Sequence, residues 1–417
     1  MAKCNGGTAG VISYSAMRLA LDRGYATAST DTGHVSSGSF DSSWALNRPD
    51  LIADFGHRGL HVMTVNGKDI SRAFYGKGAD YSYYVGCSKG GQQGLMEAQR
   101  YPDDYDGVIA GDPANNWTRF YAGSHLWYSI ATLKDPESYI PASKTQILGD
   151  AVTAACDALD GIKDGVLDDP RRCKFDPAVL TCKQGQDPAT CFTPKQVKAI
   201  KDIWSGVRTS DGTLVHRPLV PGGEAGPGGW AAWTTGSAPF TGLHWQAADG
   251  FFRFMVFSDP NRNVLNFDYD KDLAFALQKV GPVLDANDPD LRPFERRGGK
   301  MIVYHGFSDL TRTSRRSTKS ITRTWSRSTA SATTTARKRW PGRGTSSVSS
   351  WCRACSTAPV VMDPNCTTVI VRLGSRVRRT APASSPCSRA ARGRSPAAPR
   401  RCTSARNARC SGRCCLP

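Results

Sequence analysis

Hydrophobic and polar positions over the first 75 residues follow two helical patterns and one strand pattern. The segment ISYSAMRLALDRG, residues 12–24, predicts a helix, and Gly24 is suited to its C-cap. The segment YATASTDTG, residues 25–33, predicts a strand. Residues 51–75 predict a long helix. Its broad apolar face comprises Leu51, Ile52, Phe55, Leu60, Val62 and Met63.

The next 40 residues alternate strand and helix patterns. YSYYVG at 81–86 predicts a buried strand that ends in glycine, and GGQQGLMEAQRYP at 90–102 predicts a helix that stops at Pro102. GVIAGDPA at 107–114 predicts the following strand. A strand, turn, helix, strand order is typical of a parallel sheet in an α/β fold.

From residue 115 the composition changes, and two later boundaries follow. Residues 115–297 are rich in Trp, Asp and Pro and contain the run PGGEAGPGG, which predicts an inserted domain. The sheet is expected to resume at KMIVYHGFSD, residues 300–309. Beyond Asp309 we find neither helical nor strand periodicity, so we expect a disordered basic tail over 311–417.

The positive net charge of the chain, +18, arises from that tail. Residues 311–417 hold 23 of the 54 Lys and Arg but one of the 36 Asp and Glu, so residues 1–310 have a net charge of −4. An arginine-rich tail could bind phosphates with steep salt dependence, but only Trp340 and Trp351 are available there to stack on bases. We therefore expect no nucleic-acid partner.

Three further features of the sequence limit the classes of protein to which the chain can belong. No run of about 18 apolar residues is present, so no membrane span is expected. The N-terminus, MAKCNGGTAG, lacks the apolar core of a signal peptide. Eight of the 14 cysteines lie after residue 310, in no regular metal-ligand spacing.

A G-x-S-x-G motif occurs at Gly86-Cys87-Ser88-Lys89-Gly90. It lies between a predicted strand and a predicted helix, which is the context of a nucleophile elbow. Glycines at both ends leave room for close approach of strand and helix, and the helix N-terminus offers N–H groups to an oxyanion. A serine that only caps the helix is the alternative.

The longer segment CSKGGQQGLMEAQRYPDDYDGVIAGDPA at 87–114 resembles the tannase and feruloyl esterase family of α/β-hydrolases. NGGTAG at 5–10, GYATASTDTGH at 24–34 and DFGHRGLHVMT at 54–64 resemble it as well. The resemblance covers residues 4–309. It implies a serine esterase that acts on aromatic esters, with a lid domain inserted into an α/β-hydrolase fold.

The resemblance also implies roles for single residues. Ser88 is the nucleophile, and Asp309 in HGFSD is the acid that orients the catalytic histidine. Backbone N–H groups of Gly6, Gly7 and Lys89 are the expected oxyanion donors, with a plain glycine turn as the alternative for the first two. The family pairs the cysteine at Cys87 with one that follows its catalytic histidine. His305 precedes the acid and is not at the position of the base.

The segment CDALDGIKDGVLDDPRRC at 156–173 places carboxylates and glycines at a spacing suited to Ca²⁺, although it is not an EF-hand. The family resemblance implies a calcium loop with a defined ligand set. The ligands are the side chains of Asp157, Asp160 and Asp164 and the carbonyl groups of Ile162 and Val166. A solvated acidic loop is the alternative.

Two cysteine pairs are expected around that loop. Cys156 and Cys173 flank it and should form a disulfide, and Cys182 and Cys191 should form a second one nearby. Disulfides indicate an oxidising compartment, and with the family resemblance they predict a secreted protein. The tryptophans of 115–297 are expected to pack mainly as core residues.

No histidine follows His305, so the expected triad lacks its base. Possible codons of Ser346–Pro359, read one base out of register, permit the family segment Arg-Leu-Phe-Leu-Val-Pro-Gly-Met-Leu-His-Cys. The histidine then falls across Ser356 and Thr357. We hypothesise a frame shift between residues 309 and 320, although the degenerate codons permit this motif without proving it. The chain is also expected to lack the family's first strands and secretion signal.

These observations predict an α/β-hydrolase core at 1–114 and 298–310, a lid at 115–297 and an aberrant tail at 311–417. The expected function is hydrolysis of hydroxycinnamoyl or galloyl esters through an acyl-enzyme, on small molecules that are free or attached to plant polysaccharide. The expected cofactor is Ca²⁺. The alternative is an impaired chain that only binds aromatic esters, because its base is absent.

Overall fold

The computed structural model describes residues 6–36, 38–226, 228–307, 309 and 367–372. One compact unit comprises residues 1–374 and therefore contains every described residue. A second unit, residues 375–417, lies outside the described residues, as does most of the predicted tail. The re-framed segment Ser346–Pro359 also lies outside them.

A four-stranded sheet forms the centre of the hydrolase part, in the order β3-β2-β1-β4. Strands β1 (Tyr81–Cys87), β2 (Gly107–Gly111) and β3 (Lys300–Tyr304) are parallel, as predicted, and Tyr84 pairs with Val108. β2 and β3 end earlier than predicted, at Gly111 and Tyr304. The residues that follow both strands form loops that carry candidate site residues.

The fourth strand corrects one expectation. β4 (Thr367–Arg372) pairs antiparallel with β1, with Arg372 opposite Tyr81 and Thr367 opposite Gly86. We expected no strand beyond Asp309. The segment TTVIVR consists mainly of β-branched residues, which favour extended backbone, and this short run was obscured by the arginine-rich sequence around it.

Burial along β1 also differs from the prediction of a fully buried strand. Its positions alternate, so that Ser82, Tyr84 and Gly86 are buried and their neighbours are more accessible. The buried face contacts Leu95 of α4 (Lys89–Arg100), and Phe294 of α12 (Arg292–Arg296) belongs to the same core. One face of this sheet therefore packs against α4.

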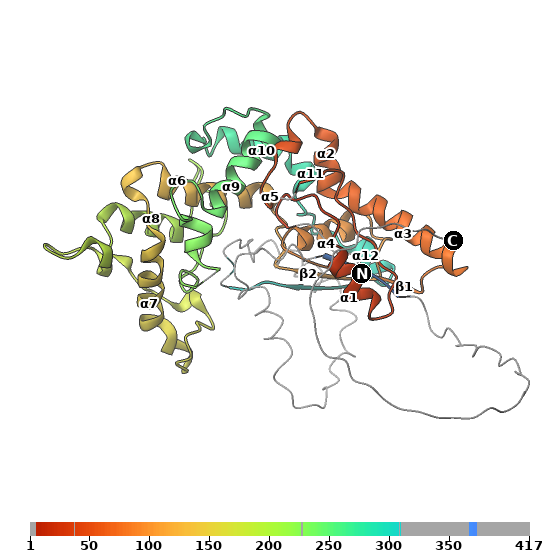
Figure 1. The fold of residues 1–417 in the computed structure, drawn as a ribbon, viewed down its shortest axis with the longest axis horizontal. Helices are drawn as coiled ribbons and strands as arrows, with labels where there is room; N and C mark the ends of the chain where they lie inside the picture. Colours follow the sequence, from red (N-terminus) through yellow and green to blue (C-terminus); the bar gives the residue numbers. More distant parts are fainter. Residues whose placement is uncertain (1–5, 37, 227, 308, 310–366, 373–417) are drawn as a thin grey trace, which may run out of the picture. The chain divides into compact units, whose positions relative to one another are not determined.

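The predicted helix over 51–75 is present but interrupted. α2 (Pro49–Ala53) continues through a π-helical turn at Asp54–Arg58 into α3 (Gly59–Tyr75), as Figure 1 shows. The π turn inserts an extra residue and shifts the helical phase. Ile52, Phe55 and Leu60 are buried as predicted, whereas Val62 is 48% exposed.

The N-terminal helix is confirmed, but the strand predicted after it is wrong. α1 spans Tyr14–Leu21, and residues 25–33 contain a bridge position at Ala26 but no strand. The segment is rich in Ser and Thr, whose side chains bind nearby backbone: the Ser13 N–H donates to the Ser29 hydroxyl, and the Thr32 N–H donates to the Thr30 hydroxyl. Such local bonds compete with strand pairing.

Most of the ordered elements between β2 and β3 are helices. Besides α12, these helices are α5 (Trp117–Phe120), α6 (Trp127–Leu133), α7 (Thr145–Cys156), α8 (Pro194–Ser205), α9 (Leu243–Gly250), α10 (Lys271–Lys279) and α11 (Gly281–Leu284). Figure 1 shows α6, α7 and α8 grouped together. They enclose a core that includes Leu148, Ile200 and Trp230, and Trp117 lies in a second core with Phe251.

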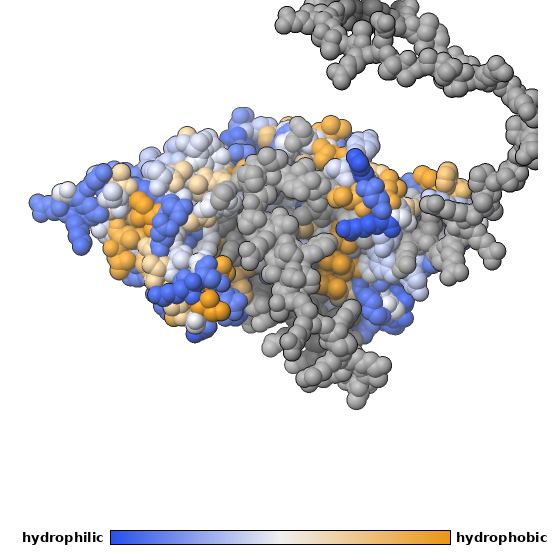
Figure 2. Space-filling model, turned by 60° about the horizontal axis from the view of Figure 1, so that its bottom comes forward, coloured by the Kyte–Doolittle hydropathy of each residue, from blue (hydrophilic) through white to orange (hydrophobic). Residues whose placement is uncertain are grey.

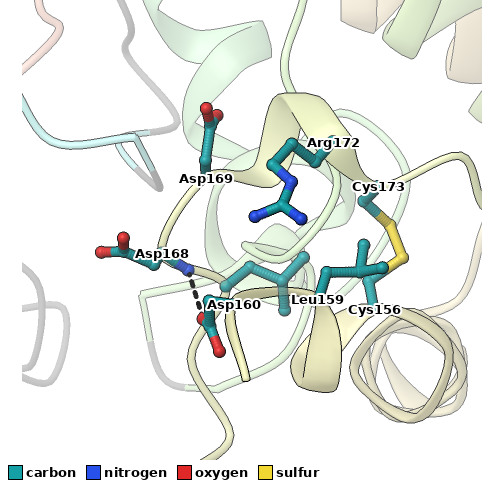
Figure 3. Close-up of a pocket in the computed structure, with 8 residues that line it drawn as sticks. Cys156, Leu159, Asp160, Asp168, Asp169, Arg172 and Cys173 are labelled. Atoms are coloured by element: carbon teal, nitrogen blue, oxygen red, sulfur yellow. Dashed lines mark hydrogen bonds between the residues drawn. A yellow bond between two sulfur atoms is a disulfide. The ribbon is translucent and has the colours of Figure 1, made fainter. Parts of the chain in front are cut away.

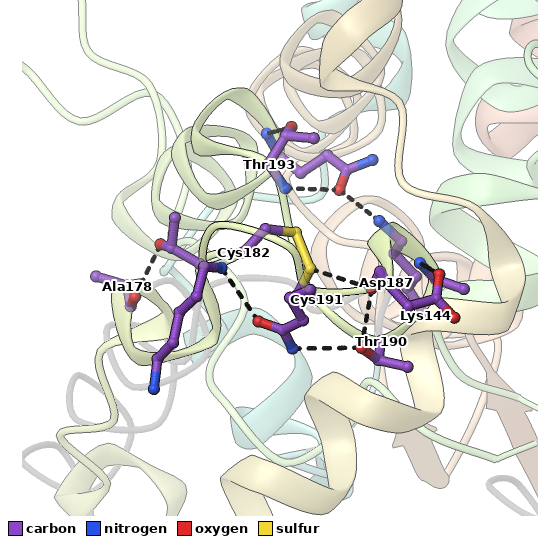
Figure 4. The surroundings of a disulfide bond; sticks show 12 residues. Lys144, Ala178, Cys182, Asp187, Thr190, Cys191 and Thr193 are labelled. Carbon is purple, nitrogen blue, oxygen red and sulfur yellow. Dashed lines mark hydrogen bonds between the residues drawn. A yellow bond between two sulfur atoms is a disulfide. The ribbon is translucent and has the colours of Figure 1, made fainter.

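Both predicted disulfides are present in this helical segment. Cys156 bonds Cys173, and Cys182 bonds Cys191. The second bond lies beside the capping box of α8, in which Thr193 and Gln196 exchange hydrogen bonds (Figure 4). Gln196 also accepts a 3.0 Å hydrogen bond from the buried Lys144 ammonium, so a polar contact ties the start of α8 to the turn at Ala142–Lys144.

The described surface mixes hydrophilic and hydrophobic side chains. Figure 2 shows one face on which blue hydrophilic residues are interspersed with smaller orange patches. None of the helices in the described part of the chain has the length and apolarity needed to cross a membrane.

Candidate active site

Ser88 lies at the turn between β1 and α4, as the motif predicts. Its backbone adopts φ 57° and ψ −120°, outside the regions that residues with a Cβ atom favour. The Ser88 N–H donates to the Gly111 carbonyl oxygen at 3.0 Å, and its own carbonyl accepts from the Ala114 N–H at 3.2 Å. These bonds fix the sharp strand-to-helix turn that presents a serine at the end of a sheet.

Close packing at this turn explains the glycine before the motif cysteine. A Cβ atom added to Gly86 would lie 2.5 Å from the Gly90 carbonyl oxygen. The strand and the first turn of α4 therefore approach as the G-x-S-x-G spacing predicts. The α4 N-terminus begins at Lys89, directly after Ser88, and its N–H groups lie at the positive end of the helix dipole.

The predicted oxyanion loop forms a tight turn that packs against residues 39–40. Gly7 has φ 55°, and a Cβ atom there would lie 2.0 Å from the Ser39 carbonyl oxygen, so only glycine fits. The carbonyl of the next residue, Thr8, contacts His34 Nε2 at 3.0 Å. Gly6 has open space around its Cα, with no atom within 4 Å of an added Cβ.

Lys89, the first residue of α4, has a buried ammonium group near Phe55, whose ring lies beside His34. Its side chain is fully buried, and Nζ lies 3.9 Å from the centre of the Phe55 ring and 2.7 Å from Gln92 Oε1. His34 packs its ring against Phe55, and burial, aided by the charge of Lys89, lowers the pKa of His34. The sequence identified the backbone N–H of Lys89 as a candidate donor but not this buried ammonium.

The ends of β2 and β3 bring together Asp112, His305 and Asp309. His305 Nδ1 lies 3.8 Å from Asp112 Oδ1, and His305 Nε2 lies 3.7 Å from Asp309 Oδ2. Only 6% of the His305 side chain is exposed. Asp112 Oδ1 accepts a 2.6 Å hydrogen bond from the Gly306 N–H, which links the two strand ends.

The motif cysteine belongs to the same edge of the sheet. Cys87 Sγ lies 3.9 Å from Asp112 Oδ2, and within the described residues Cys87 forms no disulfide. Sequence reasoning placed Asp112 inside the predicted strand at 107–114 and missed it, although an acidic residue near the end of a parallel strand is a usable signal. The carboxyl ends of parallel strands meet at one edge of the sheet.

The predicted calcium loop is an exposed turn within the Cys156–Cys173 loop. Each predicted carboxylate accepts backbone hydrogen bonds: Asp157 from the Gly165 N–H, Asp160 from the Ile162 and Asp168 N–H groups, and Asp164 from the Val166 N–H. Figure 3 shows Asp160 accepting a hydrogen bond from the Asp168 N–H, with Leu159 between Asp160 and the disulfide and with the Asp168 and Asp169 carboxylates directed outward.

These contacts bear on whether the loop residues suit a cation. Three carboxylates and the intervening carbonyl groups are the hard oxygen donors that Ca²⁺ prefers. The loop is ordered by the disulfide and by hydrogen bonds to each carboxylate, so its donor set fits the ion. Among the described residues, some groups of His, Cys, Asp and Glu have ligand atoms within 4.8 Å of one another, and these three aspartates do not form such a group. Binding would therefore require the carboxylates to turn from N–H groups toward the ion.

A serine on a sharp turn after a parallel strand, with acidic and histidine side chains at the next strand ends, defines an α/β-hydrolase. A family model described as tannase and feruloyl esterase matches residues 2–327. The chain belongs to this family. An uncharacterized esterase of Xanthomonas campestris is 39% identical over 311 residues, covering 72% of this chain and 54% of that protein.

Two further relatives support the assignment. Feruloyl esterase B of Aspergillus niger is 34% identical over 306 residues, covering 73% of this chain and 56% of that protein. The crystal structure of feruloyl esterase B from Aspergillus oryzae superposes with a TM-score of 0.68 at 29% identity, over 77% of this chain and 63% of that chain. The chain thus spans little more than half the length of the curated relatives it matches.

Proposed function

We propose that this chain is a serine carboxylic ester hydrolase of the feruloyl esterase and tannase type, acting on hydroxycinnamoyl or galloyl esters. The strained turn at Ser88 is the observation that carries the proposal. Ser88 Oγ attacks the ester carbonyl, and the alcohol leaves with a proton. Water then attacks the acyl-enzyme and releases the aromatic acid. N–H groups of Gly6, Gly7 and Lys89 stabilise the oxyanion.

The rate of this reaction in the chain as given depends on its general base. The proposed acid, Asp309, lies 3.7 Å from His305, and no histidine follows His305. His305 is held between Asp112 and Asp309 at the adjacent strand ends. A chain that binds aromatic esters but turns them over slowly is therefore the second candidate, because loss of one triad member removes most of the rate.

Hydrolysis of methyl ferulate and methyl gallate tests both candidates. We compare the chain as given, its Ser88→Ala and His305→Gln variants, and a chain with the reading frame restored after residue 309. Activity in the first chain that Ser88→Ala abolishes supports the hydrolase. Activity only in the restored chain, again dependent on Ser88, supports the impaired binder. No hydrolysis in either would reject the esterase proposal.

The His305→Gln variant identifies the base. If another histidine serves in the restored chain, that variant keeps most of its turnover while Ser88→Ala loses it. A collapse in both variants would mean that His305 acts as the base. Hydrolysis of polysaccharide-linked ferulate, measured with the same variants, tests whether the substrate is carried on plant cell-wall material.

We also propose a calcium ion in the 157–166 loop. Asp157, Asp160 and Asp164 would bind it through their carboxylates, and Ile162 and Val166 through their carbonyl groups. The ion would brace the loop against the Cys156–Cys173 bond. Titration calorimetry after chelation should show one Ca²⁺ per chain, and Asp160→Asn should weaken it. The same disulfides support secretion, which free-thiol counts on the exported protein would test.

A further inference from the structure

A second polar cluster lies away from the strand ends, between α3, α4 and the turn before β2. His61 is on the first turn of α3, Glu97 is on the third turn of α4, and Asp104 precedes β2. One ligand atom from each residue lies within 4.8 Å of the other two. Because Glu97 follows Ser88 by nine residues of helix, the two are about 13 Å apart along its axis.

Glu97 has no partner that explains its burial. Its side chain is 1% exposed, and neither carboxylate oxygen has a hydrogen-bond donor among the residues the structure describes. Lys68 is the cation whose charge acts on it, but the Lys68 ammonium donates to the Asp103 carbonyl oxygen at 3.3 Å. A buried carboxylate in this position needs a counter-charge or a proton.

The separation of the other two ligands suits a bound ion. His61 Nδ1 and Asp104 Oδ2 form a 2.7 Å hydrogen bond, and the Asp104 side chain is 8% exposed. Metal–ligand bonds of about 2.1 Å place two ligands at right angles about 3 Å apart. A cation would replace the proton of this hydrogen bond and would move the two ligand atoms slightly apart.

The histidine ring is held in place by an aromatic neighbour. His61 stacks on Tyr101 with ring centres 3.8 Å apart and an interplanar angle of 8°, and the Tyr101 hydroxyl contacts His57 Nδ1 at 2.7 Å. This is the kind of outer support that fixes the orientation of metal-binding histidines. His61 is partly accessible, so an ion could enter from the surface.

We propose that His61, Glu97 and Asp104 form a binding site for a first-row divalent cation such as Mn²⁺ or Zn²⁺. One imidazole and two carboxylates are a mixed nitrogen and oxygen set that suits these ions better than Cu⁺ or Fe–S clusters. The ion would join α3, α4 and the loop before β2. It is separate from the calcium loop, which offers oxygen donors alone.

A shared proton is the competing explanation for Glu97. Burial, and then the charge and contact of the Asp104 carboxyl, raise the pKa of Glu97 well above its ordinary value. A neutral Glu97 could then donate to Asp104 with no metal present. The two explanations differ in whether metal uptake depends on these three side chains.

Mn²⁺ is the suitable probe, because cysteines outside the two disulfides would compete for Zn²⁺. The full chain is treated with chelator, supplied with excess Ca²⁺ to fill the acidic loop, and titrated with Mn²⁺. Electron paramagnetic resonance counts the bound ions, and its pulsed form detects nitrogen coupling from imidazole. We expect one Mn²⁺ that excess Ca²⁺ does not displace, coupled to one histidine nitrogen.

Three variants make the test specific. His61→Gln should remove the nitrogen coupling, and Glu97→Gln should weaken Mn²⁺ binding about tenfold or more. Asp160→Asn, in the calcium loop, should leave both signals unchanged. Circular dichroism checks that each variant is folded. The proposal is overturned if no nitrogen-coupled Mn²⁺ binds, or if Glu97→Gln binds it as the unaltered chain does, which would favour the shared proton.

Discussion

Ser88 has a backbone conformation in which glycine is favoured over residues with a Cβ atom. Such positions carry about 1–3 kcal/mol of strain, and here the strain lies on the proposed nucleophile. Ser88→Gly should therefore raise the free energy of unfolding by about 1 kcal/mol. Ser88→Ala keeps the Cβ atom and should change it little. Urea unfolding of both variants measures the difference.

Both substitutions should abolish ester hydrolysis in whichever chain shows it, because both remove the hydroxyl. The pair thus separates strain from chemistry. A Ser88→Gly variant no more stable than Ser88→Ala would show that the turn is not strained by its side chain.

Glu224 is a second residue at which burial opposes charge. It is fully buried in the helical segment, accepts a 2.8 Å hydrogen bond from the Gly222 N–H, and burial raises its pKa to about 7. The folded chain therefore binds this proton more tightly than the unfolded chain, whose value is near 4.5. The associated stability is complete below pH 4.5 and is lost as the pH rises through 7.

Glu224→Gln keeps the shape and removes the charge. Relative to the unaltered chain it should gain stability with rising pH, reaching at most about 3 kcal/mol above pH 7, with no gain near pH 4. Urea unfolding at pH 4, 6 and 8 measures this. Glu137→Gln, at an exposed ion pair with Lys195, is the control and should change stability little at each pH. A pH-independent difference would contradict the prediction.

Helix α4 tests packing at the scale of an element. A Cβ atom added to Gly94 would lie 2.8 Å from the ring of Tyr84 on β1, and this ring is fully buried. Gly94→Ala should therefore destabilise the protein by about 1–3 kcal/mol through overpacking. The measurement is again the free energy of unfolding in urea.

The matched control is Gly67→Ala in α3. There an added Cβ would meet Ala28 Cβ at 3.4 Å, an ordinary contact, so the better helix propensity of alanine should stabilise by about 0.5–1 kcal/mol. The same substitution is thus expected to change the free energy of unfolding in opposite directions in the two helices. Equal effects would mean that propensity, rather than contact with the sheet, governs α4.

Elements with long apolar periodicity could be predicted from the sequence, and those that depend on a distant partner could not. The strand at 81–86 and its helix were found because each has a clear pattern and the glycines mark the turn between them. The segment at 25–33 has a strand composition but forms a bridge at Ala26 rather than a strand, and the hydroxyl groups of Ser29 and Thr30 accept hydrogen bonds from backbone N–H groups. β4 was missed because six residues in a biased sequence carry little signal.

The candidate site shows the same division at the scale of the whole molecule. Ser88 could be found from a local motif, whereas Asp112 and His305 come together only when β2 and β3 align in register. The buried ammonium of Lys89 depends on Phe55 and Trp117 from other parts of the chain. Contacts of this kind join distant parts of the chain, so the residue spacing within one segment does not predict them.

The two disulfides offer a test of how the molecule organises its proposed calcium loop. Replacing either pair by serine should cost about 2–3 kcal/mol of stability without Ca²⁺, since the closed loops have sequence separations of 17 and 9. Cys156→Ser with Cys173→Ser should also weaken Ca²⁺ binding, because that bond closes the loop containing Asp157, Asp160 and Asp164. Calorimetric titration with Ca²⁺ and urea unfolding measure the two effects.

Cys182→Ser with Cys191→Ser is the matched control, because that bond lies at the start of α8 and outside the acidic loop. It should lower stability by a similar amount and leave the Ca²⁺ affinity unchanged. If both pairs weaken Ca²⁺ binding equally, the loop depends on the whole helical segment. If neither pair does, the backbone hydrogen bonds to the three carboxylates are sufficient to hold the loop in shape.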